Sequence, residues 1–70
     1  MHFMKENMKE ENIKKLKELR ASIGMSQVSF AKEFGIPVRT IEDWESGKRA
    51  IKDYIIALLY RVSRAEGKIE

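Results

Sequence analysis

Seventy residues carrying 14 Lys and Arg against 11 Asp and Glu, a net charge of +3, leave room for one domain at most and favour an anionic partner. The lack of cysteine excludes a disulfide framework and a thiolate metal site, and no apolar run reaches the roughly 18 residues that a membrane span needs. We expect a soluble, cytoplasmic protein whose small core gains stability from oligomerisation.

The N-terminal third is expected to hold a flexible segment over residues 1–7 and then a helix. Asn7 and Glu10 have the spacing of a capping box, which would start the helix near Met8. From there the chain lacks Gly and Pro and is rich in Lys, Glu and Leu, which favour helix. Gly24 is expected to end it. The inner side of this helix is predicted to consist of Ile13, Leu16, Leu19, Arg20 and Ile23.

Two short apolar-periodic segments, residues 28–34 and 38–44, flank Gly35 with almost no chain between them. Two helices joined so closely must cross steeply, which predicts a helix-turn-helix. Ser26 is a good N-cap for the first helix, and Gly35 stands where that helix must stop with a positive φ. The side chains predicted to point inward are Phe30, Ala31, Phe34, Ile36, Ile41 and Trp44.

The second helix of this pair, predicted over residues 37–46, presents an outward face with no partner in the chain. Its periodicity leaves Val38, Arg39, Glu42 and Asp43 on that face. Cations gather around this helix and the loop that follows it, namely Arg39, Lys48, Arg49 and Lys52. A helix-turn-helix bound to DNA needs cations there, because the phosphate backbones flank the groove.

A final helix is predicted from about Lys52 to Ala65, before Gly67, with an unusually apolar stretch over residues 54–60. We expect Ile55, Leu58, Leu59 and Val62 to fill the core. Outside would then lie a patch formed by Tyr54, Ile56 and Tyr60. This patch is interpreted as a homodimer or partner contact; alternatively, the aromatic residues cover neighbouring loops or the N-terminal segment. The domain is therefore expected over residues 8–66, with a tail over residues 67–70.

The chain resembles the Cro/lambda-repressor (XRE-type) family of helix-turn-helix DNA-binding domains. Polar, glycine and apolar positions match in order over about two thirds of the chain, at Leu16, Leu19, Arg20, Gly24, Met25, Ser26, Gln27, Ala31, Gly35, Ile36, Thr40, Ile41, Trp44, Glu45, Gly47, Lys48 and Arg49. The resemblance implies an all-α, compact, four- to five-helix lambda-repressor-like domain. Two positions depart from the family pattern: Pro37 replaces a frequent capping Ser or Thr, and Ser46 a frequent Asn.

The resemblance also implies roles for individual residues. Gln27 would lie against the DNA backbone and brace the recognition helix, and Arg20 would bridge Glu45 and so tie the first helix to that recognition helix. Phosphate contacts are expected from Ser26, Gln27, Thr40, Lys48, Arg49 and Lys52.

Base contacts are expected from the outward side chains of the helix over residues 37–46, lying in the major groove. Arg39 can donate two hydrogen bonds to guanine O6 and N7, and Val38 can touch a thymine methyl. Asp43 or Glu42 can accept a hydrogen bond from cytosine N4, or simply orient Arg39 one turn away.

The predicted function is a sequence-specific, double-stranded DNA-binding transcriptional regulator, a repressor that binds a palindromic operator as a dimer. The resemblance implies a prokaryotic or phage-encoded protein, associated with the nucleoid when bound. The alternative is an antitoxin or other protein-interaction module that binds a partner protein, such as a toxin, through its last helix, with or without DNA binding. An enzyme is not expected, because no Ser/His/Asp set, paired carboxylates or metal-ligand spacing appears. No metal or cofactor is expected, and His2 stands alone near the terminus.

Overall fold

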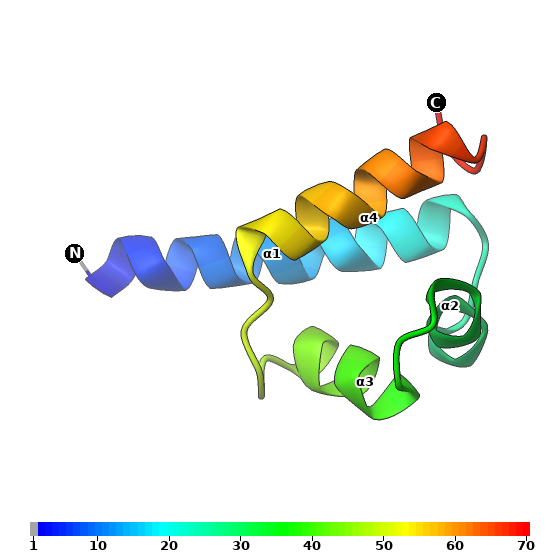
Figure 1. Cartoon of the computed structure of the whole chain (residues 1–70). Helices are drawn as coiled ribbons and strands as arrows, with labels where there is room; N and C mark the ends of the chain where they lie inside the picture. Colours follow the sequence, from blue (N-terminus) through cyan, green and yellow to red (C-terminus); the bar gives the residue numbers. More distant parts are fainter. Residues whose placement is uncertain (1) are drawn as a thin grey trace.

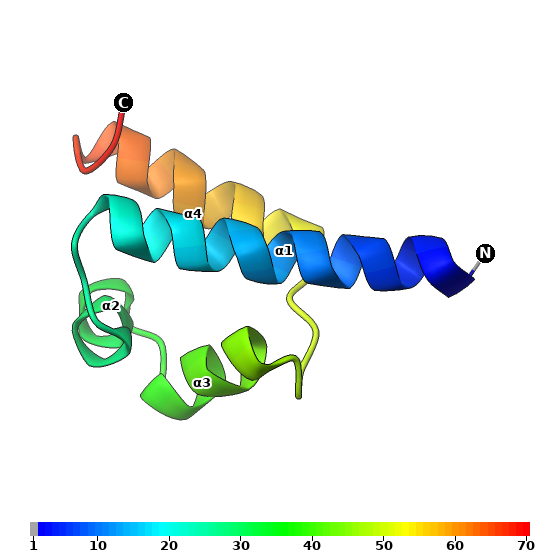
Figure 2. The same cartoon turned by 180° about the vertical axis from the view of Figure 1, so that it is seen from behind.

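The computed structural model describes residues 2–70, and the side chains from residue 10 onward. Four helices make up this part of the chain: α1 (His2–Ser22), α2 (Gln27–Phe34), α3 (Val38–Ser46) and α4 (Asp53–Ala65). In Figures 1 and 2, α1 and α4 lie side by side, and α2 and α3 lie together on one side of that pair. The predicted all-α helix-turn-helix architecture is confirmed.

Helix α1 begins at His2 rather than near Met8, so the predicted start was too late. The run without Gly or Pro lets the helix extend toward the N-terminus. Asn7 therefore lies within the helix and not at its N-cap; its side chain, and hence the predicted capping box, lies outside the described side chains. The domain limits at residues 8 and 66 stay a prediction.

Local hydrogen bonds fix both ends of α2. The Ser26 Oγ accepts from the Ser29 amide, and the Ser29 Oγ accepts from the Ser26 amide, both at 3.1 Å, so α2 starts with the predicted Ser26 cap. At the other end Gly35 adopts φ 68°, and the Ile36 amide donates to the Ala31 carbonyl at 2.9 Å. Ile36 then packs against the core, as predicted.

One hydrophobic core joins all four helices and the loop after α3. The buried side chains are Leu16, Leu19, Phe30, Ala31, Ile41, Trp44, Ile51, Ile56 and Leu59. Ile51 comes from the loop and is only 4% exposed, so this loop is anchored in the core at its last turn before α4.

The predicted orientation of α4 was wrong in part. Ile56 is buried, whereas Leu58 and Val62 are 49% and 37% exposed. The inner stripe is Ile56, Leu59 and Ser63, at the i, i+3, i+7 spacing of one helix face. Residues 54–60 of α4 are all apolar, so this stretch by itself does not show which of its sides faces α1.

Polar contacts fix that orientation instead. The Tyr60 hydroxyl donates to the Lys15 carbonyl of α1 at 2.8 Å, so Tyr60 is half-buried rather than outside as predicted. Tyr54 alone of the three predicted patch residues is well exposed, at 62%. No described helix is long and apolar enough to cross a membrane.

Candidate nucleic-acid interface

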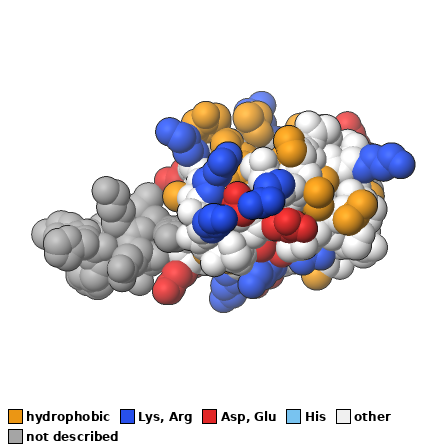
Figure 3. All heavy atoms as spheres, turned by 90° about the horizontal axis from the view of Figure 1, so that it is seen from below, with side chains coloured by type: hydrophobic (Ala, Val, Ile, Leu, Met, Phe, Trp, Pro, Cys, Tyr) orange, Lys and Arg blue, Asp and Glu red, His pale blue; other side chains and the backbone are white. Residues whose placement is uncertain are grey.

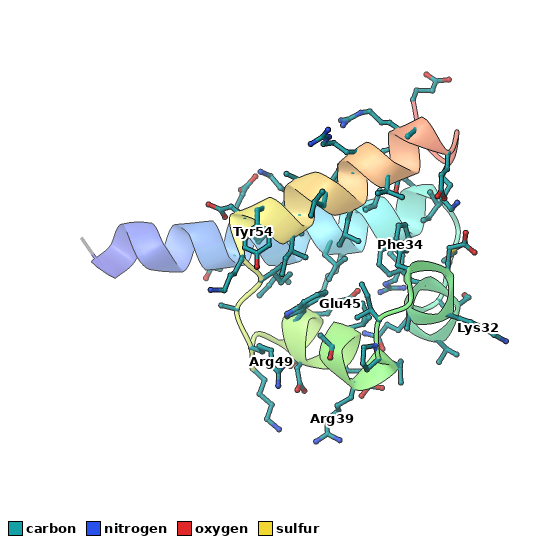
Figure 4. All side chains as sticks on the ribbon, viewed as in Figure 1. Lys32, Phe34, Arg39, Glu45, Arg49 and Tyr54 are labelled. Atoms are coloured by element: carbon teal, nitrogen blue, oxygen red, sulfur yellow. The ribbon has the colours of Figure 1, made fainter. Side chains whose placement is uncertain are left out.

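Helix α3 turns one face into the core and the other away from the protein. Pro37 is its N-cap, and the Pro37 carbonyl accepts from the Thr40 and Ile41 amides at 2.9 and 3.3 Å. Ile41 and Trp44 are buried, as predicted. On the opposite face Arg39 points away from the bundle in Figure 4, and its side chain is 74% exposed.

The Arg39 side chain is paired within its own helix. Its Nε lies 3.6 Å from the Asp43 Oδ1, one turn along, and the Asp43 side chain is only 16% exposed. This distance is an ion pair without a close hydrogen bond, so both Nη groups of Arg39 remain available for an acceptor outside the protein. Of the other predicted base contacts, Glu42 is exposed and Val38 is half-buried against the core.

A bidentate ion pair fixes α3 to α1. Arg20 donates from Nε to Glu45 Oε2 and from Nη2 to Glu45 Oε1, both at 2.8 Å. Gln27 Nε2 donates to the same Oε1 at 3.1 Å, so α2 joins the network. The predicted Arg20–Glu45 bridge is therefore present, and Gln27 braces the end of α3.

The Glu45 side chain is 5% exposed yet stays ionised. Burial alone would raise the pKa of its carboxyl, but the hydrogen bonds from Arg20 and Gln27 outweigh burial and hold the pKa below its ordinary value. The hydrogen bond to Glu45 raises the pKa of the Arg20 guanidinium in turn. Each partner thus stabilises the charge of the other, and the network joins α1, α2 and α3 through three side chains.

The cations predicted for phosphate contact are accessible. Lys48, Arg49 and Lys52 are exposed in and beside the loop that leaves α3. Figure 3 shows Lys and Arg side chains gathered around acidic ones on the face seen from below, which is the side where α2 and α3 lie in Figure 1. The main chain of this loop is held to α3, because the Arg49 amide donates to the Asp43 carbonyl at 3.1 Å.

The remaining predicted phosphate contacts are partly engaged within the protein. Thr40 is half-buried. Ser26 is exposed, but its hydroxyl already contacts Ser29 Oγ at 2.7 Å. The half-buried Gln27 gives one amide donor to Glu45. These side chains can offer DNA only what their internal hydrogen bonds leave over.

A family model described as helix-turn-helix (HTH_3), the Cro/C1 or XRE type, matches residues 16–64, which is more than half of the chain. The chain belongs to this helix-turn-helix family. The family is one of DNA-binding regulators, so membership supports a DNA-binding regulator. Searches of curated proteins and of solved structures found no match.

One buried polar residue that supports the loop after α3 was not identified from the sequence. Asn12 of α1 is 6% exposed, and its Nδ2 donates to the Ile51 carbonyl at 2.8 Å and to Asp53 Oδ1 at 2.7 Å. Its position could have been found, because Asn12 lies four residues before Leu16 and seven before Leu19 on the buried face.

The exposed apolar surface of this helix-turn-helix domain differs from the predicted patch. Tyr54, Leu58 and Val62 are the exposed large hydrophobic residues of α4, and their spacing of four places them along one face. We call these three residues the α4 stripe. Ile56, predicted for the patch, belongs to the core, and Tyr60 contacts α1.

Proposed function

We propose that this protein is a sequence-specific, double-stranded DNA-binding transcriptional regulator that inserts α3 into the major groove. The exposed Arg39 on a helix held by the partly buried Arg20–Glu45 pair carries this proposal. A side chain reads a base edge only if its helix is held firmly against the rest of the protein. The Arg20–Glu45–Gln27 network supplies that support.

The proposed reading uses the outward residues near the start of α3. Arg39 donates from its guanidinium to guanine O6 and N7. Asp43, one turn along, aligns Arg39 and accepts from cytosine N4 where the sequence offers that donor. Val38 is half-buried, so only part of its side chain is left to meet a thymine methyl. Glu42 is exposed on the same face, where its negative charge would repel nearby phosphates.

Phosphate contacts would set the register of the helix in the groove. Lys48, Arg49 and Lys52 are exposed beside α3 and would meet one backbone. Ser26 and Gln27 would meet the other through the donors that their internal hydrogen bonds leave free, together with the half-buried Thr40. A domain bound in this way across a promoter would exclude other proteins from it, and we therefore propose that the protein represses transcription.

We further propose that the protein dimerises through the α4 stripe. The stripe is symmetric about Leu58, with Tyr54 and Val62 four residues to either side, so two antiparallel copies of α4 would bring Leu58 against Leu58 and Tyr54 against Val62. In Figure 1, α4 runs across the view above α3. A two-fold axis perpendicular to α4 and directed toward α3 would leave both copies of α3 on one side, as a palindromic operator requires.

Selection of bound sequences from randomised duplexes tests the proposed function. We expect an enriched palindrome whose half-sites lie one helical turn apart, about 34 Å, with a guanine in each half. Recovery of a single asymmetric half-site would contradict the dimer. Failure to enrich any sequence would contradict the DNA-reading function itself.

A second function is favoured by the same α4 stripe. An antitoxin or other interaction module would cover Tyr54, Leu58 and Val62 with a partner protein instead of a second copy. A protein that stays monomeric at millimolar concentration and enriches no DNA sequence would support this alternative. A dimer that buries Tyr54, Leu58 and Val62 against a second copy would leave the α4 stripe unavailable to such a partner and would reject this alternative.

A further inference from the structure

Asn12 is a buried amide that lies far from α3 in the sequence but is joined to the loop that leaves it. Its Nδ2 group uses both hydrogens, one on the Ile51 carbonyl at 2.8 Å and one on Asp53 Oδ1 at 2.7 Å. Ile51 and Asp53 are the two neighbours of Lys52. Asn12 therefore hydrogen-bonds the residues on both sides of this lysine, while Lys52 itself is exposed.

The other contacts of this segment leave Lys52 little freedom in its main chain. Lys52 is the N-cap of α4, and its carbonyl accepts from the Ile55 and Ile56 amides at 3.0 and 3.3 Å. Ile51 is buried in the core. We call residues 47–52, between α3 and α4, the exit loop. It is fixed to α3 near its start by the Arg49–Asp43 hydrogen bond and to α1 at its end by the Asn12–Ile51 hydrogen bond.

From these contacts we infer that Asn12 is a positioning residue that sets Lys52, and with it the exit loop, against the DNA backbone. The inference rests on the proposed DNA-binding function and deepens it. A lysine held at a fixed place costs less entropy to order on a phosphate than a free one. A buried amide without hydrogen-bond acceptors would destabilise the fold, so the two hydrogen bonds explain why a polar residue can stand at this buried position.

A double-mutant cycle on Asn12 and Lys52 tests this inference. Asn12→Leu keeps the branching and the number of side-chain heavy atoms but removes both donors, and Lys52→Gln removes the charge. Each single variant should lower affinity for the selected and for a random duplex by the same factor, roughly three- to tenfold. Each should also reduce the slope of log affinity against log salt by up to about 0.9, the value for one phosphate. The double variant should lose little beyond either single one.

Controls separate positioning from general stability. Lys14→Gln removes the charge of an exposed lysine elsewhere on α1 and should leave the salt slope unchanged. Asn12→Ala serves in place of Asn12→Leu if the leucine variant does not fold. All affinities are measured well below the unfolding temperature of each variant, so that partial unfolding does not lower them.

Hydrogen exchange in the free protein gives a second readout that needs no DNA. Asn12→Leu should speed exchange of the hydrogen-bonded amides at the two ends of this loop, those of Arg49, Ile55 and Ile56, by roughly tenfold or more, while the hydrogen-bonded amides of α2 keep their rates. Additive losses in the cycle, or unchanged affinity with unchanged loop exchange, would overturn the inference. If the wild-type protein binds no duplex, the proposed function fails, and loop exchange still decides whether Asn12 holds the loop.

Discussion

Glu45 shows how a buried charge can serve geometry in this domain. Its carboxylate accepts three hydrogen bonds, two from Arg20 and one from Gln27. Burying a carboxylate costs free energy unless it is paired, so such a pair fixes an arrangement more than it stabilises the fold. Here the arrangement is the placement of α3 against α1 and α2, on which any reading by Arg39 depends.

Glu45→Gln should destabilise the protein in a pH-dependent way. At pH 7 the free energy of unfolding should fall by about 1–3 kcal/mol, because an amide cannot accept all three donors and puts its own NH₂ group against them. The folded-state pKa of Glu45 lies below its ordinary value of 4.5. Its contribution is therefore complete above pH 4.5 and lost as pH falls through the folded-state pKa.

Urea unfolding of both proteins between pH 7 and pH 3 measures this difference. The gap between wild type and Glu45→Gln should narrow below pH 4.5. A gap that stays constant down to pH 3 would show that the Glu45 charge does not contribute. Asp43→Asn is a useful control, since its carboxylate pairs with the exposed Arg39 and should matter far less to stability.

At the scale of elements, the turn between α2 and α3 depends on one backbone conformation. Gly35 adopts φ 68°, and a Cβ placed there would meet no atom within 4 Å. Any loss on substitution therefore comes from the backbone and not from a clash. We expect Gly35→Ala to lower the free energy of unfolding by about 1–2 kcal/mol.

Gly35→Asn is the matched variant, because Asn tolerates the left-handed region better than Ala. Thermal unfolding should place Gly35→Asn between wild type and Gly35→Ala. Equal losses for the two variants would mean that the left-handed conformation is not the cause.

The α4 stripe makes a prediction about assembly. Leu58→Glu should weaken the dimer at least about tenfold, because a carboxylate would be desolvated at the centre of the interface. Ala57→Glu introduces the same charge one residue away, on an exposed position off the stripe, and should have a smaller effect. Sedimentation equilibrium measures both. A wild-type protein that is monomeric, or a dimer insensitive to Leu58→Glu, would contradict the proposed interface.

Viewed as a whole molecule, the helix-turn-helix was predictable because its parts carry local signals. Ser26, Gly35 and Gly47 mark helix ends through capping and positive φ, and Ile41 and Trp44 show the inner face of α3 by spacing alone. The Arg20–Glu45 pair followed from the family resemblance rather than from spacing.

The predictions that were wrong or missing concern features that depend on contacts between segments far apart in the chain. The rotation of α4 is set by the Tyr60–Lys15 and Asn12–Asp53 hydrogen bonds, which join residues more than forty positions apart. The apolar run over residues 54–60 by itself carries no pattern from which that rotation can be inferred. The role of Asn12 was missed for the same reason, because its acceptors lie in the loop before α4 and in the first residue of α4.

The protein holds Arg39 outward on α3, and we propose that this side chain reads a base in the major groove. The most direct test compares wild type and Arg39→Ala on the selected duplex and on a random duplex at one salt concentration. We expect Arg39→Ala to lose about 1–3 kcal/mol of binding free energy on the selected duplex, to lose much less on the random one, and to relax the preference at one base pair. Equal losses of binding free energy on both duplexes would make Arg39 a phosphate contact and contradict base reading by Arg39.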